Sequence, residues 1–313
     1  MPGVLPDATA RGAVQNARLP GASRPSRRKI NHRYLLFLAP ALVLFAVFQA
    51  YPIVRSLILS FQSREGGELA WVGFRQYERL IGDPNFWLAL GNTLIILVIQ
   101  VPLMLLIALV VASALRSSYV KLKTGFRLIY FLPAVTALLA YAIVFRALLN
   151  GDSGVANQII GMFGVEPINW LGDPFWARVS LISAVTWRWM GYNMVIMLAG
   201  MSSIDPSVRE AATMDGANAG QTFRYITVPL LKPVILFCVV TSTIGTLQMF
   251  DEPYILTQGG PAGATLTIVL YLYRTAFKSL DFGYASAIAW VLVIIVMIIA
   301  LIQMRLLRDK DDE

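Results

Sequence analysis

The sequence predicts an all-α integral membrane protein with about six transmembrane helices. Of its 313 residues, 57% are hydrophobic and only 14% are charged, and the mean hydropathy is +0.64. A soluble protein of this length carries charge on roughly a quarter of its residues. The charge here is too sparse for such a surface, whereas a bilayer requires helices of about 20 apolar residues. The bilayer is therefore the expected solvent.

Six apolar stretches are long enough to cross a bilayer as helices. They comprise residues 34–54, 86–115, 128–145, 177–201, 233–250 and 282–304. The fourth is interrupted by Arg188, about eleven residues from its start. An unpaired charge at that depth is expensive. We therefore expect Arg188 to face a cavity or a carboxylate of another subunit.

Basic residues predict that both termini face the cytoplasm, because lysine and arginine gather on that side of a membrane. They cluster in the N-terminal tail, in the second and fourth connecting loops and at the C-terminus. The predicted organisation is a disordered basic cytoplasmic tail (1–33), a first transmembrane helix (34–60), an extracytoplasmic loop (61–85), a transmembrane core (86–307) containing a cytoplasmic loop (202–232), and a charged cytoplasmic tail (308–313).

Several classes of site are excluded by composition. The single cysteine, Cys238, excludes an intramolecular disulfide, and the single histidine, His32, excludes a multi-histidine metal site. No G-x-x-x-x-G-K-[ST] segment occurs, so the chain does not bind ATP through a P-loop. The net charge of +8 is explained by cytoplasmic loops and requires no nucleic-acid partner.

The cytoplasmic loop predicts two short helices joined by a sharp turn. Asp205 before Pro206, or Ser207, is suited to cap the first helix, and Gly216 to end it. The stretch from 218 to 221, Asn-Ala-Gly-Gln, predicts a capping box for the second. Two interpretations stay open from these residues: a capped hairpin without a partner, or a small-residue surface that docks on another protein.

The same loop resembles a known family. Its residues Glu210, Ala211, Ala212, Asp215, Gly216, Ala217, Phe223, Ile226, Pro229 and Pro233 match the pattern EAA-x-x-DGA-x5-F-x-x-I-x-x-P-x3-P. This is similar to the EAA loop of permease subunits of bacterial ATP-binding-cassette (ABC) importers, and its DGA form is typical of the carbohydrate-uptake branch. The segments YPIVRSLILSF, NTL at 92–94 and LTQGGPAGATLTIVLYLYRTAF extend the resemblance to these permeases, so only the N-terminal tail falls outside the likeness. Within them, the element Gly259-Gly260-Pro261 is similar to that of the maltose-type first permease.

The resemblance implies a type I ABC importer permease fold in a bacterial inner membrane. It implies that the EAA segment is a coupling helix for a cytoplasmic ATPase, with Glu210 as a salt-bridge partner and Gly216 at the turn. The expected partners are a second homologous permease, a homodimeric ATPase that binds ATP and Mg²⁺, and an extracytoplasmic solute-binding protein. The chain itself is expected to bind no cofactor and to catalyse no reaction.

Polar side chains within two spans are candidates for the substrate path. They are Arg188, Tyr192 and Asn193 in the fourth span, and Thr241, Gly245 and Gln248 in the fifth. The last three recur with Glu252 at helical spacing, which predicts one shared face. Contact with a partner permease would produce the same stripe, and Asp251 and Glu252 would be solvated if they lie outside the membrane.

Other functions were weighed against a sugar importer. A membrane enzyme requires a convergent acid–base pair or metal set, and the spans contain only isolated charges. A proton-coupled secondary transporter is expected to place paired ionisable groups at mid-membrane. Arg188 alone gives little support for such a transporter. An ABC permease for a non-sugar solute such as glycerol phosphate remains the main alternative.

Overall fold

The computed structural model describes residues 32–65, 68–116 and 122–308 and divides the chain into two units, Met1–Pro52 and Ile53–Glu313. In the first unit, α1 (His32–Phe45) and the π-helical turn η1 (Ala46–Ala50) contain most of the first predicted span. Helix α1 begins at His32, so the predicted tail 1–33 is two residues too long. The rest of that tail, and residues 309–313 of the C-terminal tail, lie outside the described residues.

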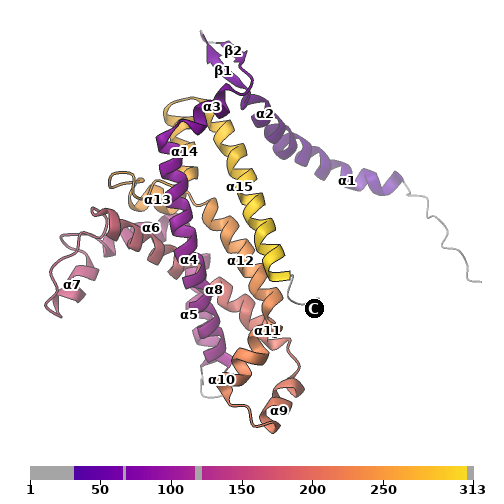
Figure 1. Cartoon of the computed structure of the whole chain (residues 1–313), viewed down its shortest axis with the longest axis vertical. Helices are drawn as coiled ribbons and strands as arrows, with labels where there is room; N and C mark the ends of the chain where they lie inside the picture. The colour runs from indigo at the N-terminus through magenta and orange to yellow at the C-terminus, as the bar shows by residue number, and fades with distance from the viewer. Residues whose placement is uncertain (1–31, 66–67, 117–121, 309–313) are drawn as a thin grey trace, which may run out of the picture. The chain divides into compact units, whose positions relative to one another are not determined.

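The second unit begins within α2 (Tyr51–Leu59) and contains a helical bundle with a small external hairpin. The hairpin pairs β1 (Gln62–Glu65) with β2 (Glu68–Trp71) antiparallel, and α3 (Arg75–Ile81) follows it. The predicted loop 61–85 is therefore folded. Helix α4 (Pro84–Arg116) runs from this end toward the end that holds α9 (Pro206–Met214) and α10 (Ala219–Thr222) (Figure 1).

The remaining elements complete the bundle and its loops. They are α5 (Lys123–Val135), α6 (Leu138–Leu148), α7 (Val155–Gly161), α8 (Pro174–Ser202), α9 (Pro206–Met214), α10 (Ala219–Thr222), η2 (Phe223–Thr227), α11 (Val228–Leu230), α12 (Lys232–Leu247), α13 (Asp251–Leu256), α14 (Ile268–Tyr273), η3 (Arg274–Lys278) and α15 (Phe282–Arg308).

Three helical segments of the described chain are long and apolar enough to cross a membrane: Phe37–Leu59, Pro84–Arg116 and Phe282–Leu306. The number rises to five if each of two bent pairs counts as one span. Helix α8 has 29 residues but a sequence of lower hydropathy. Six spans with both termini inside therefore remain a prediction.

The third predicted span, 128–145, is not one straight helix. Helices α5 and α6 meet at 99° because Thr136 and Ala137 adopt extended backbone conformations between them. The Thr136 hydroxyl donates a 2.7 Å hydrogen bond to the Pro133 carbonyl at this break. Just before the fifth predicted span, the helical segment Ala219–Leu230 meets α12 at 66°.

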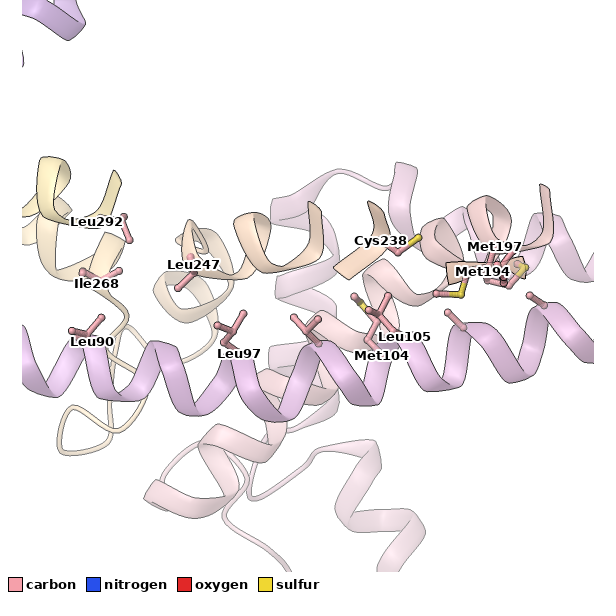
Figure 2. Packing of buried hydrophobic residues seen from close by; sticks show 14 of the residues in the cluster. Leu90, Leu97, Met104, Leu105, Met194, Met197, Cys238, Leu247, Ile268 and Leu292 are labelled. Carbon is pink, nitrogen blue, oxygen red and sulfur yellow. The ribbon is translucent and has the colours of Figure 1, made fainter. Parts of the chain in front are cut away.

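The core of the bundle lies where α4 packs against α8 and α12, and where α12 packs against α15. Side chains of α4 face those of the other helices in Figure 2, which labels Leu97, Met104, Met194, Cys238 and Leu292 among others. Helices α5 and α8 approach closely at Gly191, where a Cβ would lie 1.7 Å from the Tyr130 carbonyl oxygen. Such contact between backbones is a common way to pack helices in a membrane.

The loop between α13 and α14 is held by two side chains from distant helices. The Asn92 amide on α4 donates to the carbonyls of Gly263 and Leu266, at 2.7 and 3.1 Å. The Arg178 guanidinium on α8 donates to the Asn92 side-chain oxygen at 3.1 Å and to the Ala264 carbonyl at 2.9 Å. The NTL segment therefore places this loop against the bundle.

Candidate functional site

A cavity of about 290 Å³ opens between α4, α6, α8, α12 and α13. Its wall combines amides, hydroxyls, aromatic rings and carboxylates. The polar and aromatic members are Gln100, Trp189, Tyr192, Asn193, Thr241, Ser242, Thr246, Gln248, Phe250, Asp251 and Glu252. A concave site with a few convergent polar groups is the usual form of a small-molecule site.

Five of the six predicted substrate-path residues line this cavity: Tyr192, Asn193, Thr241, Gly245 and Gln248. The sixth, Arg188, is not part of the lining. No atom lies within 4 Å of the position that a Cβ would take on Gly245, so this glycine leaves open space. The structure therefore brings residues from two predicted spans to one cavity.

The prediction that Glu252 continues the helical face of Thr241, Gly245 and Gln248 is wrong. Helix α12 ends at Leu247, Gln248 caps it, and Glu252 belongs to the separate helix α13. The Thr267 hydroxyl donates to the Met249 carbonyl at 3.1 Å within this break. Glu252 still lines the cavity, because α13 packs against α6 and α8 after the chain turns.

Two buried residues at the cavity wall, Gln100 and Thr246, were missed by sequence reasoning. The Thr246 hydroxyl donates to the Gln100 side-chain oxygen at 2.9 Å, and the Gln100 amide lies 3.2 Å from the Met104 sulfur. These residues come from α4 and α12 and are 146 positions apart. The one sequence feature that could have identified Gln100 as a cavity residue was its amide side chain within an apolar span.

The inner wall is ordered by further hydrogen bonds. The Asn193 amide donates to the Trp189 carbonyl at 3.1 Å, and its side-chain oxygen accepts from Ser242 at 3.4 Å. The Thr241 hydroxyl donates to the Phe237 carbonyl at 2.7 Å, which leaves its oxygen available as an acceptor. These side chains are therefore oriented before any ligand binds.

Arg188 lies behind the wall, in contact with aromatic rings. Its side chain is 6% exposed, and its guanidinium carbon lies 4.5 Å from the centre of the Tyr141 ring and 5.5 Å from that of Trp189. Glu252 is 5% exposed, so it is buried as well. The interpretation of Glu252 as a solvated residue is therefore wrong, because α13 is packed into the bundle.

The second candidate site is the α9–α10 hairpin, whose predicted caps are present. The Asp205 carboxylate accepts a 2.9 Å hydrogen bond from the Ser207 backbone N–H, and Pro206 is the first residue of α9. This hydrogen bond lowers the pKa of the Asp205 carboxyl. Asn218 and Gln221 form the predicted capping box of α10, with bonds of 2.9 and 2.8 Å.

The turn depends on Gly216, which has a φ of +81°. The Gly216 N–H donates to the Thr213 carbonyl and the Ala217 N–H donates to the Ala212 carbonyl, at 3.1 and 2.9 Å. This pair of bonds is a Schellman motif, in which glycine avoids the strain of the left-handed conformation. The predicted end of the first helix is therefore confirmed in detail.

The EAA residues differ in exposure around this turn. Ala212 is buried and Ala217 is partly buried, whereas Glu210, Ala211, Asp215 and Gly216 are exposed. Met214 is exposed too, although its side chain is large and apolar. The hairpin thus presents two carboxylates and an apolar side chain on its surface.

Comparison with known proteins identifies the family of this chain. The family model described as "Binding-protein-dependent transport system inner membrane component" matches residues 84–310. The chain belongs to this family. This permease is a multi-pass component of the inner membrane, and its six-residue EAA signature lies within the matched region.

Curated relatives cover nearly the whole permease. It is 46% identical over 280 residues to the lactose transport system permease protein LacF of Rhizobium radiobacter, covering 88% of this chain and 94% of the relative. It is 35% identical over 273 residues to the arabinooligosaccharides transport system permease protein AraP of Halalkalibacterium halodurans, covering 87% and 86%.

A solved structure shares the fold. It is a chain of a bacterial alginate ABC transporter in complex with an alginate pentasaccharide-bound periplasmic protein. The TM-score is 0.79 at 23% identity, and the alignment covers 90% of this chain and 96% of that chain. The permease therefore has the fold of an ABC transporter transmembrane subunit.

Proposed function

We propose that this permease moves a sugar or oligosaccharide across the inner membrane through the cavity. The observation that carries this proposal is a wall of amides, hydroxyls and aromatic faces inside an otherwise apolar bundle. Sugar hydroxyls form hydrogen bonds with such amides, and the C–H faces of sugar rings pack on aromatic side chains. The lactose and arabinooligosaccharide systems named among its relatives support the same solute class.

The α9–α10 hairpin is the element that receives the energy of ATP hydrolysis. Its carboxylates Glu210 and Asp215 are exposed and suited to bind arginine side chains of a partner. Gly216 sets the angle between the two helices. The sequence has no P-loop, so a separate homodimeric ATPase binds ATP and Mg²⁺, and this subunit acts as a transporter and not as an enzyme.

Two further partners complete the proposed importer. A second, homologous permease forms the other half of the pathway, and an extracytoplasmic binding protein delivers the solute. The binding-protein-dependent family and the periplasmic protein in the alginate transporter complex support the second of these partners. Closure of the ATPase would then shift the permease pair between inward- and outward-facing states.

Uptake measurements test the proposed transport. Cells that carry the complete system are given a panel of radiolabelled sugars, including lactose and arabinooligosaccharides, together with glycerol phosphate. We expect uptake of a sugar that is lost without this chain or its ATPase and that persists when a protonophore dissipates the proton gradient. Uptake that depends on the proton gradient would contradict the proposal of an ATP-driven importer. Uptake restricted to glycerol phosphate would contradict the proposal that the solute is a sugar.

Co-purification of the ATPase tests the coupling role. Glu210→Lys and Gly216→Pro are expected to reduce ATPase binding and transport, because the first reverses a surface charge and the second is incompatible with a φ of +81°. Glu78→Lys on α3 is the matched control, since Glu78 is also exposed and lies on a helix at the opposite end. Normal ATPase binding and transport in both hairpin variants would reject this role.

A further inference from the structure

A row of five aromatic rings leads away from the cavity. It comprises Phe250, Tyr254, Tyr273, Phe277 and Phe282, and we call it the aromatic row. The Phe250 and Tyr254 rings stack with their centres 5.2 Å apart, and the Tyr273 ring lies 4.9 and 5.6 Å from them. The Phe277 ring lies 5.2 Å from Tyr273 and 6.2 Å from Phe282. Each ring therefore contacts the next at a distance typical of attractive aromatic pairs.

The two ends of the aromatic row lie in different parts of the bundle. Phe250 lines the cavity, and Tyr254 lies on α13, which also contributes to the cavity wall. Tyr273 ends α14, Phe277 belongs to η3, and Phe282 begins α15, a candidate membrane span. In Figure 1, the start of α15 lies nearer to the β1–β2 hairpin than α13 does, at the end opposite α9 and α10. The row therefore connects the cavity with the end of the bundle that is predicted to face outward.

The rings of the aromatic row keep surface available for a ligand. Tyr254 is 36% exposed, Phe277 62% and Phe282 45%, whereas Phe250 and Tyr273 are half-buried. Contacts with neighbouring rings limit the motion of these side chains, and each has only two side-chain torsions to fix. Binding a ligand there therefore costs little conformational entropy of the protein.

Contact with membrane lipid alone does not explain these rings. The other exposed large apolar side chains on α15 have no aromatic ring and suit contact with lipid tails. They are Val293, Ile294, Met297, Ile298, Leu301, Ile302, Met304 and Leu306. An aromatic belt lies at the depth of the lipid headgroups. The aromatic row instead leads from the start of a span to a cavity that reaches Gln100, at the middle of α4.

The chemistry of the aromatic row matches a saccharide. The C–H faces of sugar rings pack on aromatic side chains, and the tyrosine hydroxyls can exchange hydrogen bonds with sugar hydroxyls. Successive ring centres lie 4.9–6.2 Å apart, so the whole row is longer than one sugar ring. Each contact is weak by itself, which allows a solute to move on, as passage through a pathway requires.

We propose that the aromatic row is a binding track along which an oligosaccharide passes, one sugar ring after another, between the outward end of the bundle and the cavity. The inference rests on the proposed function, because it names the path by which the sugar reaches that cavity. Tyr273 and Phe277 contact the saccharide outside the cavity, so they favour chains of two or more sugar rings over single sugars. A second permease and membrane lipid are the alternative occupants, and the test distinguishes them.

The test measures sugar binding to the full-length chain in lipid nanodiscs, since the cavity and the aromatic row both belong to this chain. Saturation-transfer NMR compares lactose with glucose and galactose, its two components, and arabinotriose with arabinose. We expect each oligosaccharide to bind at least about fivefold more tightly than its component sugars, because it contacts the row and the cavity together.

Substitutions in the aromatic row remove one ring each. Tyr273→Leu and Phe277→Leu are each expected to weaken oligosaccharide binding about fivefold, the contribution of one ring contact. Their effect on monosaccharides is expected to be smaller, because the cavity holds these sugars, and persisting monosaccharide binding shows that the variants are folded. Tyr273→Phe keeps the ring and is expected to retain most of the affinity. Phe175→Leu is the matched control, because Phe175 is 65% exposed and pairs with Trp176 at 5.3 Å outside the row.

Three results would overturn this inference. Unchanged oligosaccharide affinity in both leucine variants would show that the row is not a sugar track, and loss of a co-purifying second permease or of bound lipid in those variants would then assign the row to that neighbour. A loss in Tyr273→Phe as large as in Tyr273→Leu would exclude ring packing as the cause. If no sugar binds to wild type, the track and the cavity assignment both fail, whereas sugar uptake that requires the ATPase would still support the importer.

Discussion

The α9–α10 hairpin and the cavity wall differ in the sequence separation of the contacts that hold them. In the hairpin, the Asp205 cap, the Gly216 turn and the Asn218 capping box join residues at most five positions apart. In the cavity wall, the Thr246–Gln100 hydrogen bond joins residues 146 positions apart. The hairpin can therefore form its shape from its own sequence, whereas the cavity exists only when the helices have packed.

This difference separates the effects of mutations in the two regions. A change in the packed helices that surround the cavity is expected to lower the stability of the whole bundle, because it affects contacts between helices. A change in the exposed hairpin is expected to leave the bundle folded and to alter only its interaction with a partner. Four predictions test this contrast, from the largest expected effect to the smallest.

Gly191→Val on α8 is expected to have the largest effect. Its Cβ would lie 1.7 Å from the Tyr130 carbonyl oxygen, and backbone cannot yield as a flexible side chain does. We expect a loss of at least about 3 kcal/mol, seen as a collapse of the monodisperse peak in detergent size exclusion. Gly245→Ala is the control, because that site has open space. Similar behaviour of the two variants would contradict the close approach of α5 and α8.

Asn92→Ala is expected to cost about 3 kcal/mol, since three hydrogen bonds of roughly 1 kcal/mol each are lost around a buried side chain. The thermal midpoint of the purified chain measures this loss. Arg178→Ala is expected to cost less, and the double variant less than the sum, because both residues act on one loop. Additive effects would mean that the two side chains act independently.

Gly216→Ala is expected to strain the turn by about 1–2 kcal/mol, because alanine disfavours a φ of +81°. No atom blocks the added methyl group, so the effect is purely conformational. Asn tolerates this conformation, and Gly216→Asn should therefore retain more ATPase binding than Gly216→Ala. The thermal midpoint of the bundle should stay unchanged in both variants. A large fall in that midpoint would show that the hairpin is not independent of the bundle.

The Asp205 cap is expected to show the smallest effect, as a pH dependence. Its pKa is lowered from the ordinary value of 3.8, so the cap stabilises α9 above that value and is lost as the pH falls through the lowered pKa. Asp205→Asn keeps a capping oxygen without a titrating group. Hydrogen exchange at the Ser207 N–H should respond to acid more in wild type than in this variant. Identical acid responses would exclude the carboxylate as the cause.

The residues of the loop 202–232 were enough to predict its helices, its capping box and its glycine turn. These features depend on hydrogen bonds between residues that are close in the sequence, so a short stretch of sequence is enough to predict them. The apolar runs likewise identified the bilayer as solvent, because hydropathy is a property of each segment taken alone. Tyr192, Asn193, Thr241, Gly245 and Gln248 were recognised as candidates because polar groups are uncommon within such runs.

Only the tertiary structure decided how those candidates meet. The 99° bend between α5 and α6 and the end of α12 at Leu247 depend on packing, and they bring Glu252 to the cavity from a separate helix. The burial of Glu252 follows from the same arrangement. Sequence periodicity predicted one continuous face there, because it assumes an unbroken helix. Contacts between helices far apart in the chain determined where that helix ends and which side chains line the cavity.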